Sequence, residues 1–293
     1  MISVGLIGAS DPRHRSFLGA LHRRRAGVRI VGLSDSDPAL RQEFAGRYEL
    51  PTWSDHRDLL AAARPSLVAV ALPDAGPVVI DALRSGVDVL VAPPVCTTNE
   101  DLDTIADLAA SSGRRVTAAH TYRGHPAART AKELIDAGRL GRVDLMSLII
   151  GPVDSGDQVR LVEAVDVFGW LTGARSATAG SVADDPEDRA FGELIMAVSS
   201  ESAALEIRRH PDLAPGAGII QVAGDAGAVE WDLRTGLLRS ALAGREPVTV
   251  ACGPLVEPAE WVLNNLLRKP HPAITTEQSL ATTRMWLESS PSR

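Results

Sequence analysis

Short apolar runs alternate with amphipathic segments over the first 120 residues. The runs are typical of buried strands, and the segments between them repeat their apolar positions at helical spacing. This alternation indicates βαβ units, so the sequence predicts an α/β fold with a doubly wound parallel sheet. The predicted strands are 2–7, 28–33, 67–71, 87–91 and 115–119, with a short extended piece at 51–53. The predicted helices are 16–25, 38–48, 55–63, 78–85 and 99–111.

The pattern changes after residue 120. A helix at 127–137 and a strand at 143–150 precede a helix at 161–171, and six strand-like runs separated by short turns follow. Consecutive strands with short turns predict a mainly antiparallel sheet in an α+β domain. The six runs are 190–198, 203–209, 218–223, 228–232, 237–241 and 248–252, and helices at 260–267 and 277–287 close the chain. We therefore expect a dinucleotide-binding domain at 1–120 and a substrate and oligomerisation domain at 121–293.

The turn after the first strand falls where a G-x-G-x-x-G phosphate-binding motif would stand. Gly8 keeps the first glycine, whereas Ser10 and Arg13 replace the second and third. One interpretation is a modified diphosphate site, in which the Ser10 hydroxyl, the Arg13 guanidinium and helix N–H groups face the phosphates. The alternative is a plain β–α turn with a surface arginine.

An acidic residue follows the second strand. Asp35 stands where a carboxylate can bond a ribose 2′-OH and repel a 2′-phosphate, which favours NAD over NADP. Arg13 and Arg15 weaken that preference, because guanidinium groups bind phosphate well. Asp37 before Pro38 is the better helix cap, so Asp35 is left for another role. We expect NAD or NADP as the cofactor.

Several stretches together resemble the Gfo/Idh/MocA oxidoreductases, which include glucose-fructose oxidoreductase and inositol dehydrogenase. They are 31–38, 67–73, 86–98, 118–140 with Tyr122-Arg123-Gly124-His125-Pro126, 166–173 and 275–280. The resemblance implies a Rossmann domain followed by a domain whose open sheet carries the substrate site and an oligomer interface. It adds Ser36, Leu72, Pro73 and Pro94 to the expected cofactor contacts.

Two places depart from the family pattern. The family has Glu-Lys-Pro after the fifth strand, and its lysine contacts cofactor and substrate; here the triplet is Ala92-Pro93-Pro94. Pro93, at the expected substrate contact, has no charge and no donor. On the helix that lines the substrate, the family's histidine position is Glu163, while Asp166 is kept.

Hydride transfer needs a group that moves a proton at the substrate oxygen. The candidates are Glu163 and Asp166 on the substrate helix, and His120 and Tyr122 after the sixth strand. Burial would raise the pKa of Glu163 toward a value suited to this work. Arg123 could hold a substrate carboxylate. Each has a structural alternative: Glu163 pairing with Arg160 on the surface, His120 as a satisfied strand-end residue, and Tyr122 as packing.

Three functions remain open. The first is an NAD(P)-dependent oxidoreductase that acts on a small polar substrate, sugar-like or a hydroxy or keto compound, with a non-standard acid/base set. The second uses the same scaffold without net redox chemistry, as a lyase, isomerase or cyclase. The third is a non-catalytic sensor or partner subunit that binds the cofactor.

Composition limits the partners and the cellular location that we expect. The 293 residues carry a net charge of −7 and no extended basic face, which argues against nucleic acid and anionic membranes as partners. Cys96 and Cys252 have no disulfide or metal-ligand spacing, and we expect no metal site. No signal peptide or bilayer-length apolar run is present, so we expect a soluble cytoplasmic protein. From the resemblance we expect a homodimer or homotetramer through the second-domain sheet.

Overall fold

The chain forms two compact units in the computed structural model. The structure describes residues 1–8, 27–152, 157–179, 193–215, 217–254, 262, 264 and 274–289. Unit 1 consists of Met1–His120 and Ala259–Thr283, and unit 2 of Thr121–Pro258 and Arg284–Arg293. The change from one unit to the other at residue 120 coincides with the change in sequence pattern, but the predicted second domain also contained 259–283, which belongs to unit 1.

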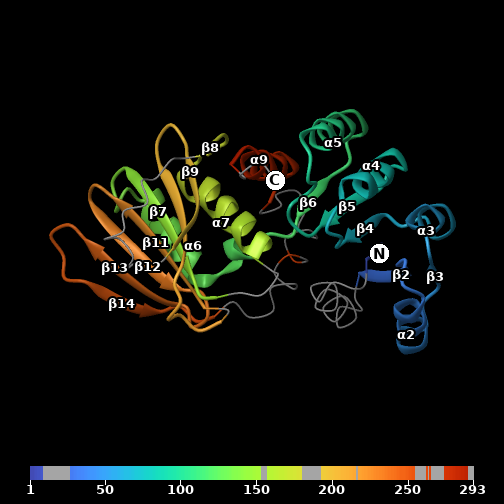
Figure 1. Cartoon of the computed structure of the whole chain (residues 1–293), viewed down its shortest axis with the longest axis horizontal. Helices are drawn as coiled ribbons and strands as arrows, with labels where there is room; N and C mark the ends of the chain where they lie inside the picture. The colour runs from blue at the N-terminus through green and yellow to red at the C-terminus, as the bar shows by residue number, and fades with distance from the viewer. Residues whose placement is uncertain are drawn as a thin grey trace. The chain divides into compact units, whose positions relative to one another are not determined.

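Unit 1 contains a parallel sheet in the order β3-β2-β1-β4-β5-β6 (Figure 1). This order places β1 between β2 and β4. The chain builds the sheet outward from β1 in one direction and then, from β4 on, in the other, which is the arrangement of a dinucleotide-binding sheet. The strands are short and apolar because helices cover both faces of such a sheet. They are β1 (Ile2–Ile7), β2 (Val28–Ser34), β3 (Thr52–Trp53), β4 (Leu67–Val70), β5 (Asp88–Val91) and β6 (Val116–Ala118).

Side-chain caps begin three of the four helices described between these strands. Asp37 accepts the backbone N–H of Ala39 before α2, and Asp55 and Thr98 do the same for the first turns of α3 and α5. The predicted helix at 78–85 starts earlier, at Gly76, because Pro77 is favourable in a first turn. The helices are α2 (Pro38–Tyr48), α3 (His56–Ala63), α4 (Gly76–Arg84) and α5 (Asn99–Ser112). The predicted helix at 16–25 lies outside the described residues.

The closing helix α9 (Thr276–Ser289) covers the free edge of β6. Val116 donates its N–H to the hydroxyl of Thr276 at 3.1 Å, and Ala118 donates to Ser279 at 3.0 Å. Unpaired N–H groups on an edge strand are a liability that needs covering. This contact explains why the start of α9 belongs with unit 1.

Unit 2 contains a mixed sheet in the order β14-β13-β12-β11-β7-β10-β9-β8, with α6 and α7 against one face (Figure 1). Neighbouring strands are antiparallel apart from the parallel pair β7–β10, which confirms the mainly antiparallel prediction. The strands are β7 (Val143–Ile150), β8 (Thr178–Ala179), β9 (Glu193–Ser199), β10 (Ala204–Arg209), β11 (Gly218–Gly224), β12 (Gly227–Asp232), β13 (Leu237–Leu242) and β14 (Val248–Ala251). The helices are α6 (Pro126–Asp136), α7 (Asp157–Thr172) and the one-turn 3-10 helix η1 (Tyr122–Gly124).

Alternating burial along β7 fixes which face of the second sheet is the core. Met146, Leu148 and Ile150 are fully buried, and they pack with Phe168 from α7 in one apolar cluster. The residues between them are half-buried or exposed, as expected for a sheet with one covered face. Within the described part of the chain, no helix has the length and apolarity needed to cross a membrane.

Candidate functional site

The carboxyl ends of β1, β2 and β4 lie side by side in unit 1. Gly8 directly follows β1, has φ +84°, and donates its N–H to the carbonyl of Ser34 at 2.9 Å. A Cβ at this position would lie 2.4 Å from the carbonyl oxygen of Ala71, so only glycine fits without displacing a strand end. A close backbone turn at the point where strand order reverses is where dinucleotides bind.

The acidic residue after β2 is held in place from both sides. Asp35 is 8% exposed, and its Oδ1 accepts the N–H of Asp37 at 2.8 Å. One guanidinium nitrogen of Arg41, Nη1, donates hydrogen bonds to the carbonyls of Asp35 and Ser36, at 2.8 and 2.9 Å. The sequence analysis did not identify Arg41, although its position in the first turn of the following helix could be predicted from the sequence. The result is a preorganised loop that carries a carboxylate at the cofactor edge, by which we mean the carboxyl ends of β1, β2 and β4, where the cofactor is predicted to bind.

The other predicted cofactor contacts fall at the same edge. Leu72 is half-buried and Pro73 exposed after β4, and Pro94 is half-buried after β5. Pro93, the predicted substrate contact, is buried beside Pro94. The peptide bond between Pro93 and Pro94 is cis. Ser10 and Arg13, the predicted phosphate contacts, lie outside the described residues.

Glu163 lies buried on α7 and bonds the start of η1. Its exposed fraction is 4%, so the alternative that placed it on the surface is wrong. Thr121 donates its N–H to both carboxylate oxygens, at 2.9 and 3.0 Å, and its hydroxyl to Oε1 at 3.0 Å. Tyr122 donates its N–H to Oε2 at 3.2 Å. Thr121, which the sequence reasoning missed, is the partly exposed neighbour of this carboxylate.

The surroundings of Glu163 bring its ionisation near neutral pH. Burial, and then the negative charge of Asp166, raise the pKa of Glu163 from 4.5 to about 7. The bonds from Thr121 and Tyr122 favour the charged form and oppose this rise. A carboxyl that is half ionised near pH 7 can both accept and return a proton.

Arg123 and Asp166 form a buried ion pair beside this carboxylate. Arg123 Nε and Nη2 donate to the two oxygens of Asp166, at 2.7 and 2.6 Å, and both side chains are under 5% exposed. The Arg123 guanidinium also lies 5.9 Å from the ring centre of Trp170, at cation–π distance. Asp166 therefore occupies the two guanidinium donors of Arg123 that we expected to hold a substrate carboxylate.

The remaining two candidates differ in what their surroundings allow. Burial raises the pKa of the Tyr122 phenol above its usual 10, so it stays protonated at neutral pH and can donate a hydrogen bond. His120 directly follows β6 and is fully buried. The surroundings of Glu163 raise its pKa to about 7, a value that suits proton transfer near neutral pH.

Comparison with known proteins supports a dinucleotide-binding fold for the first part of the chain. Residues 2–120 match the model of an oxidoreductase family with an NAD-binding Rossmann fold. The matched model is that of the Gfo/Idh/MocA family, and it covers residues 2–120 of the chain. The match ends where unit 1 gives way to unit 2, and it confirms the predicted fold and resemblance.

Two curated relatives share part of the chain. Inositol 2-dehydrogenase of Burkholderia ambifaria is 26% identical over 188 residues, which cover 59% of this chain and 53% of that protein. A 1-carboxy-3-chloro-3,4-dihydroxycyclohexa-1,5-diene dehydrogenase of Comamonas testosteroni is 33% identical over 122 residues, 40% of this chain and 30% of that protein. The matched segments thus span about half or less of the length of these relatives.

Solved structures match over nearly the whole chain. An oxidoreductase domain protein from Kribbella flavida covers 97% of this chain and 95% of its own, with 19% identity and a TM-score of 0.78. An oxidoreductase from Agrobacterium radiobacter, solved with NAD+, L-tartaric acid and magnesium, covers 97% and 94% with 12% identity and a TM-score of 0.78. At these identities the likeness establishes the fold of both units.

Proposed function

We propose that this protein is an NAD(P)-dependent oxidoreductase acting on a small polar substrate, sugar-like or a hydroxy or keto compound, with Glu163 as the proton-transferring group. The observation that carries the proposal is a buried, hydrogen-bonded carboxylate whose pKa lies at about 7. General acid–base groups work best when their pKa is close to the operating pH. Family membership supplies the redox setting, and the NAD+ and tartrate complex of the Agrobacterium protein is a precedent on this fold.

The cofactor edge fits a dinucleotide. The close turn at Gly8 admits no Cβ, because that atom would lie 2.4 Å from the carbonyl oxygen of Ala71, and the buried Asp35 carboxylate after β2 suits a ribose hydroxyl. A nicotinamide dinucleotide supplies hydride acceptance or donation when bound. The buried charge of Asp35 opposes a 2′-phosphate, so NAD is the expected form. Asp35→Ala should therefore weaken NAD binding and reduce the preference over NADP, measured by titration with both.

Glu163 would take the substrate hydroxyl proton during oxidation and return it during reduction. Because Glu163 is buried, the hydroxyl of the half-buried residue Thr121 is its route to a substrate, 3.0 Å from Oε1. The Thr121 hydroxyl passes its own proton to the carboxylate as it accepts one from the substrate. Arg123 and Trp170 act through Asp166, since they fix the helix face that carries both carboxylates.

The first experiment is thermal shift with NAD(H) and NADP(H), followed by turnover on a panel of polyols and hydroxy acids at the reduced-nicotinamide absorbance. The rate of the active substrate should show an inflection near pH 7. Glu163→Gln should lower kcat by roughly 10²- to 10⁴-fold and remove the inflection. Thr121→Val should lower kcat, and Thr121→Ser should keep it. Stabilisation by neither cofactor would contradict the proposal, and an unchanged pH profile in Glu163→Gln would reduce Glu163 to a structural role.

A second candidate is proton-transfer chemistry without net redox, as in a lyase, isomerase or cyclase. It is favoured by Pro93, which provides no charged or donor side chain at the end of β5. Substrate turnover with no net change in nicotinamide absorbance would support it. Cofactor and ligand binding without turnover would support the third function, a sensor or partner subunit.

We also propose that the β13–β14 edge of the second sheet forms a homo-oligomer interface. Leu237, Val248 and Val250 are large apolar side chains exposed on β13 and β14, at 48%, 53% and 44%. Exposed apolar residues gathered on neighbouring strands are typical of interaction surfaces. Light scattering should give a dimer or tetramer, and Val250→Lys should shift it toward the monomer.

A further inference from the structure

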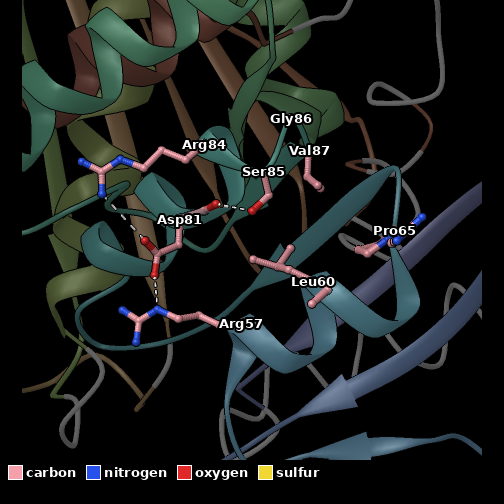
Figure 2. Close-up of a pocket in the computed structure, with 10 residues that line it drawn as sticks. Arg57, Leu60, Pro65, Asp81, Arg84, Ser85, Gly86 and Val87 are labelled. Carbon is pink, nitrogen blue, oxygen red and sulfur yellow. Dashed lines mark hydrogen bonds and ion pairs between the residues drawn. The ribbon is translucent and has the colours of Figure 1, made fainter.

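A pocket of about 670 Å³ lies between α3 and α4 in unit 1 (Figure 2). It opens at the amino-terminal ends of β4 and β5, since Pro65 precedes β4 and Val87 precedes β5. The cofactor edge is at the opposite, carboxyl ends of these strands. Its volume falls in the range of roughly 300–1,000 Å³ that small-molecule sites occupy. Its lining comes from one face of α3 and the end of α4: Arg57, Leu60, Ala61, Arg64, Pro65, Asp81, Arg84, Ser85, Gly86 and Val87.

The charge of this pocket is positive in a protein of net charge −7. Its lining has three arginines against one aspartate. The C-terminal ends of α3 and α4 add about half a negative charge each, so a surplus of roughly one positive charge remains. The positive sign therefore survives both the aspartate and the helix dipoles.

The Asp81 carboxylate already has hydrogen-bond partners, and it positions the neighbouring arginines. Burial opposes its ionisation, but bonds from His56 and Arg57, at 3.0 and 2.8 Å, outweigh burial and lower the pKa of Asp81. Figure 2 shows Arg57 and Arg84 approaching its carboxylate from two sides. Asp81 thus holds the two helices' guanidinium groups at the pocket while its own charge is largely neutralised.

Arg84 and Arg64 keep donors for a ligand. Arg84 Nη1 lies 3.9 Å from Asp81 Oδ1, which is too long for a hydrogen bond. Among the described residues, the structure places no ion pair on Arg64, which is exposed after the last turn of α3. Leu60, Pro65 and Val87 are buried residues that provide an apolar floor beneath them.

We propose that this pocket binds a small organic anion, with carboxylate or phosphate groups held by Arg84 and Arg64 and an apolar body resting on Leu60 and Val87. Guanidinium groups bind both kinds of anion through two parallel bonds. Arg57 and Arg84 are about two-thirds exposed, at 67% and 62%, so the affinity should fall as salt is added.

The test is calorimetric titration of the full chain at low salt with three probes: phenyl phosphate, isophthalate and inorganic phosphate. Saturating NAD+ is included in a parallel series, because phosphate groups also suit the cofactor edge. We expect phenyl phosphate or isophthalate to bind more tightly than inorganic phosphate, with or without NAD+. The organic probe that binds better identifies phosphate or carboxylate as the natural group.

Variants locate the binding. Arg84→Ala should weaken it by at least about tenfold, and Arg84→Lys by less, because lysine keeps the charge but loses the fork. Arg142→Ala removes an exposed arginine from unit 2 and should change nothing. Circular dichroism confirms that each variant is folded. The proposal is overturned if neither organic probe binds saturably, if inorganic phosphate binds as tightly, or if the Arg64→Ala/Arg84→Ala double variant binds unchanged.

Discussion

Arg123 and Asp166 join η1 to α7 through two parallel hydrogen bonds in the interior of unit 2. Nε lies 2.7 Å from Oδ2 and Nη2 lies 2.6 Å from Oδ1, with the side chains 4% and 0% exposed. A buried pair of this kind contributes little net stability when intact, because desolvation offsets the attraction. Loss of one partner is different, since it leaves a lone charge in the core.

We therefore predict that Asp166→Asn lowers the free energy of unfolding by about 3–5 kcal/mol. Urea denaturation followed by circular dichroism measures this. Asp144→Asn is the matched control, because it breaks the ion pair of Asp144 with Arg142 on the exposed side of β7, 2.8 Å long, and should leave the midpoint in place.

The double variant Arg123→Met/Asp166→Leu separates charge from packing. It should regain most of the lost stability, because apolar residues of similar size replace buried pairs well. A double variant as unstable as Asp166→Asn alone would show that the pair's geometry, and not its unbalanced charge, supports η1.

Sequence pattern predicted the strands of unit 1 well because each is a short apolar run between helices of a parallel sheet. It misassigned 259–283, because the pattern of α9 does not reveal which strand it covers. Thr276 and Ser279 share a helix face that is readable from their spacing. Their bonds to β6 link positions about 160 residues apart, and single-sequence periodicity carries no such long-range pairing.

The same limit applies to the candidate site. The sequence placed Glu163 and Asp166 three residues apart on one helix, so their shared face was predictable. It did not predict Thr121 as the donor to Glu163 or Asp166 as the partner of Arg123, since both bonds join η1 to a distant helix. The pKa of Glu163 follows from that burial, which only the packed structure supplies.

Glu163 should make unit 2 less stable as pH rises. Its pKa in the folded protein, about 7, exceeds the ordinary 4.5, so the folded state binds more protons between these values. Its contribution to stability is full below pH 4.5 and is lost as pH rises through 7, on the order of 3 kcal/mol in total. Glu163→Gln should lack this slope in urea midpoints measured from pH 4 to 8. A variant with the wild-type slope would contradict the raised pKa.

Gly8→Ala should abolish cofactor binding. The new Cβ would lie 2.4 Å from the carbonyl oxygen of Ala71, in a backbone conformation with φ +84° that alanine disfavours by roughly 1 kcal/mol. Gly113→Ala is the control, because Gly113 also has positive φ (+64°) at the end of α5 but nothing lies within 4 Å of its added Cβ. Both variants should lose thermal stability, and only Gly8→Ala should lose the thermal shift produced by NAD. If NAD shifts the melting temperature of both variants equally, the turn at Gly8 does not contact the cofactor.

His125 should give a pH dependence of opposite sign. It caps α6, where Nδ1 accepts the N–H of Ala127 at 3.2 Å and Nε2 faces the carbonyl of Leu233 at 3.1 Å, so the ring is neutral with its hydrogen on Nε2. Burial lowers the pKa of His125 below the usual 6.5, against the opposing effects of Leu233 and Asp232.

The neutral ring of His125 therefore stabilises the fold above pH 6.5, and this contribution is lost as pH falls through the lower folded value. His125→Asn keeps a capping oxygen for α6 but does not titrate. Its urea midpoint should fall less than that of the wild type on acidification below pH 6.5, whereas Glu163→Gln should differ from the wild type as pH rises toward 7. Identical acid limbs for His125→Asn and the wild type would mean that the imidazole takes up its proton at the same pH in the folded and unfolded chains, which contradicts the lowered pKa of His125.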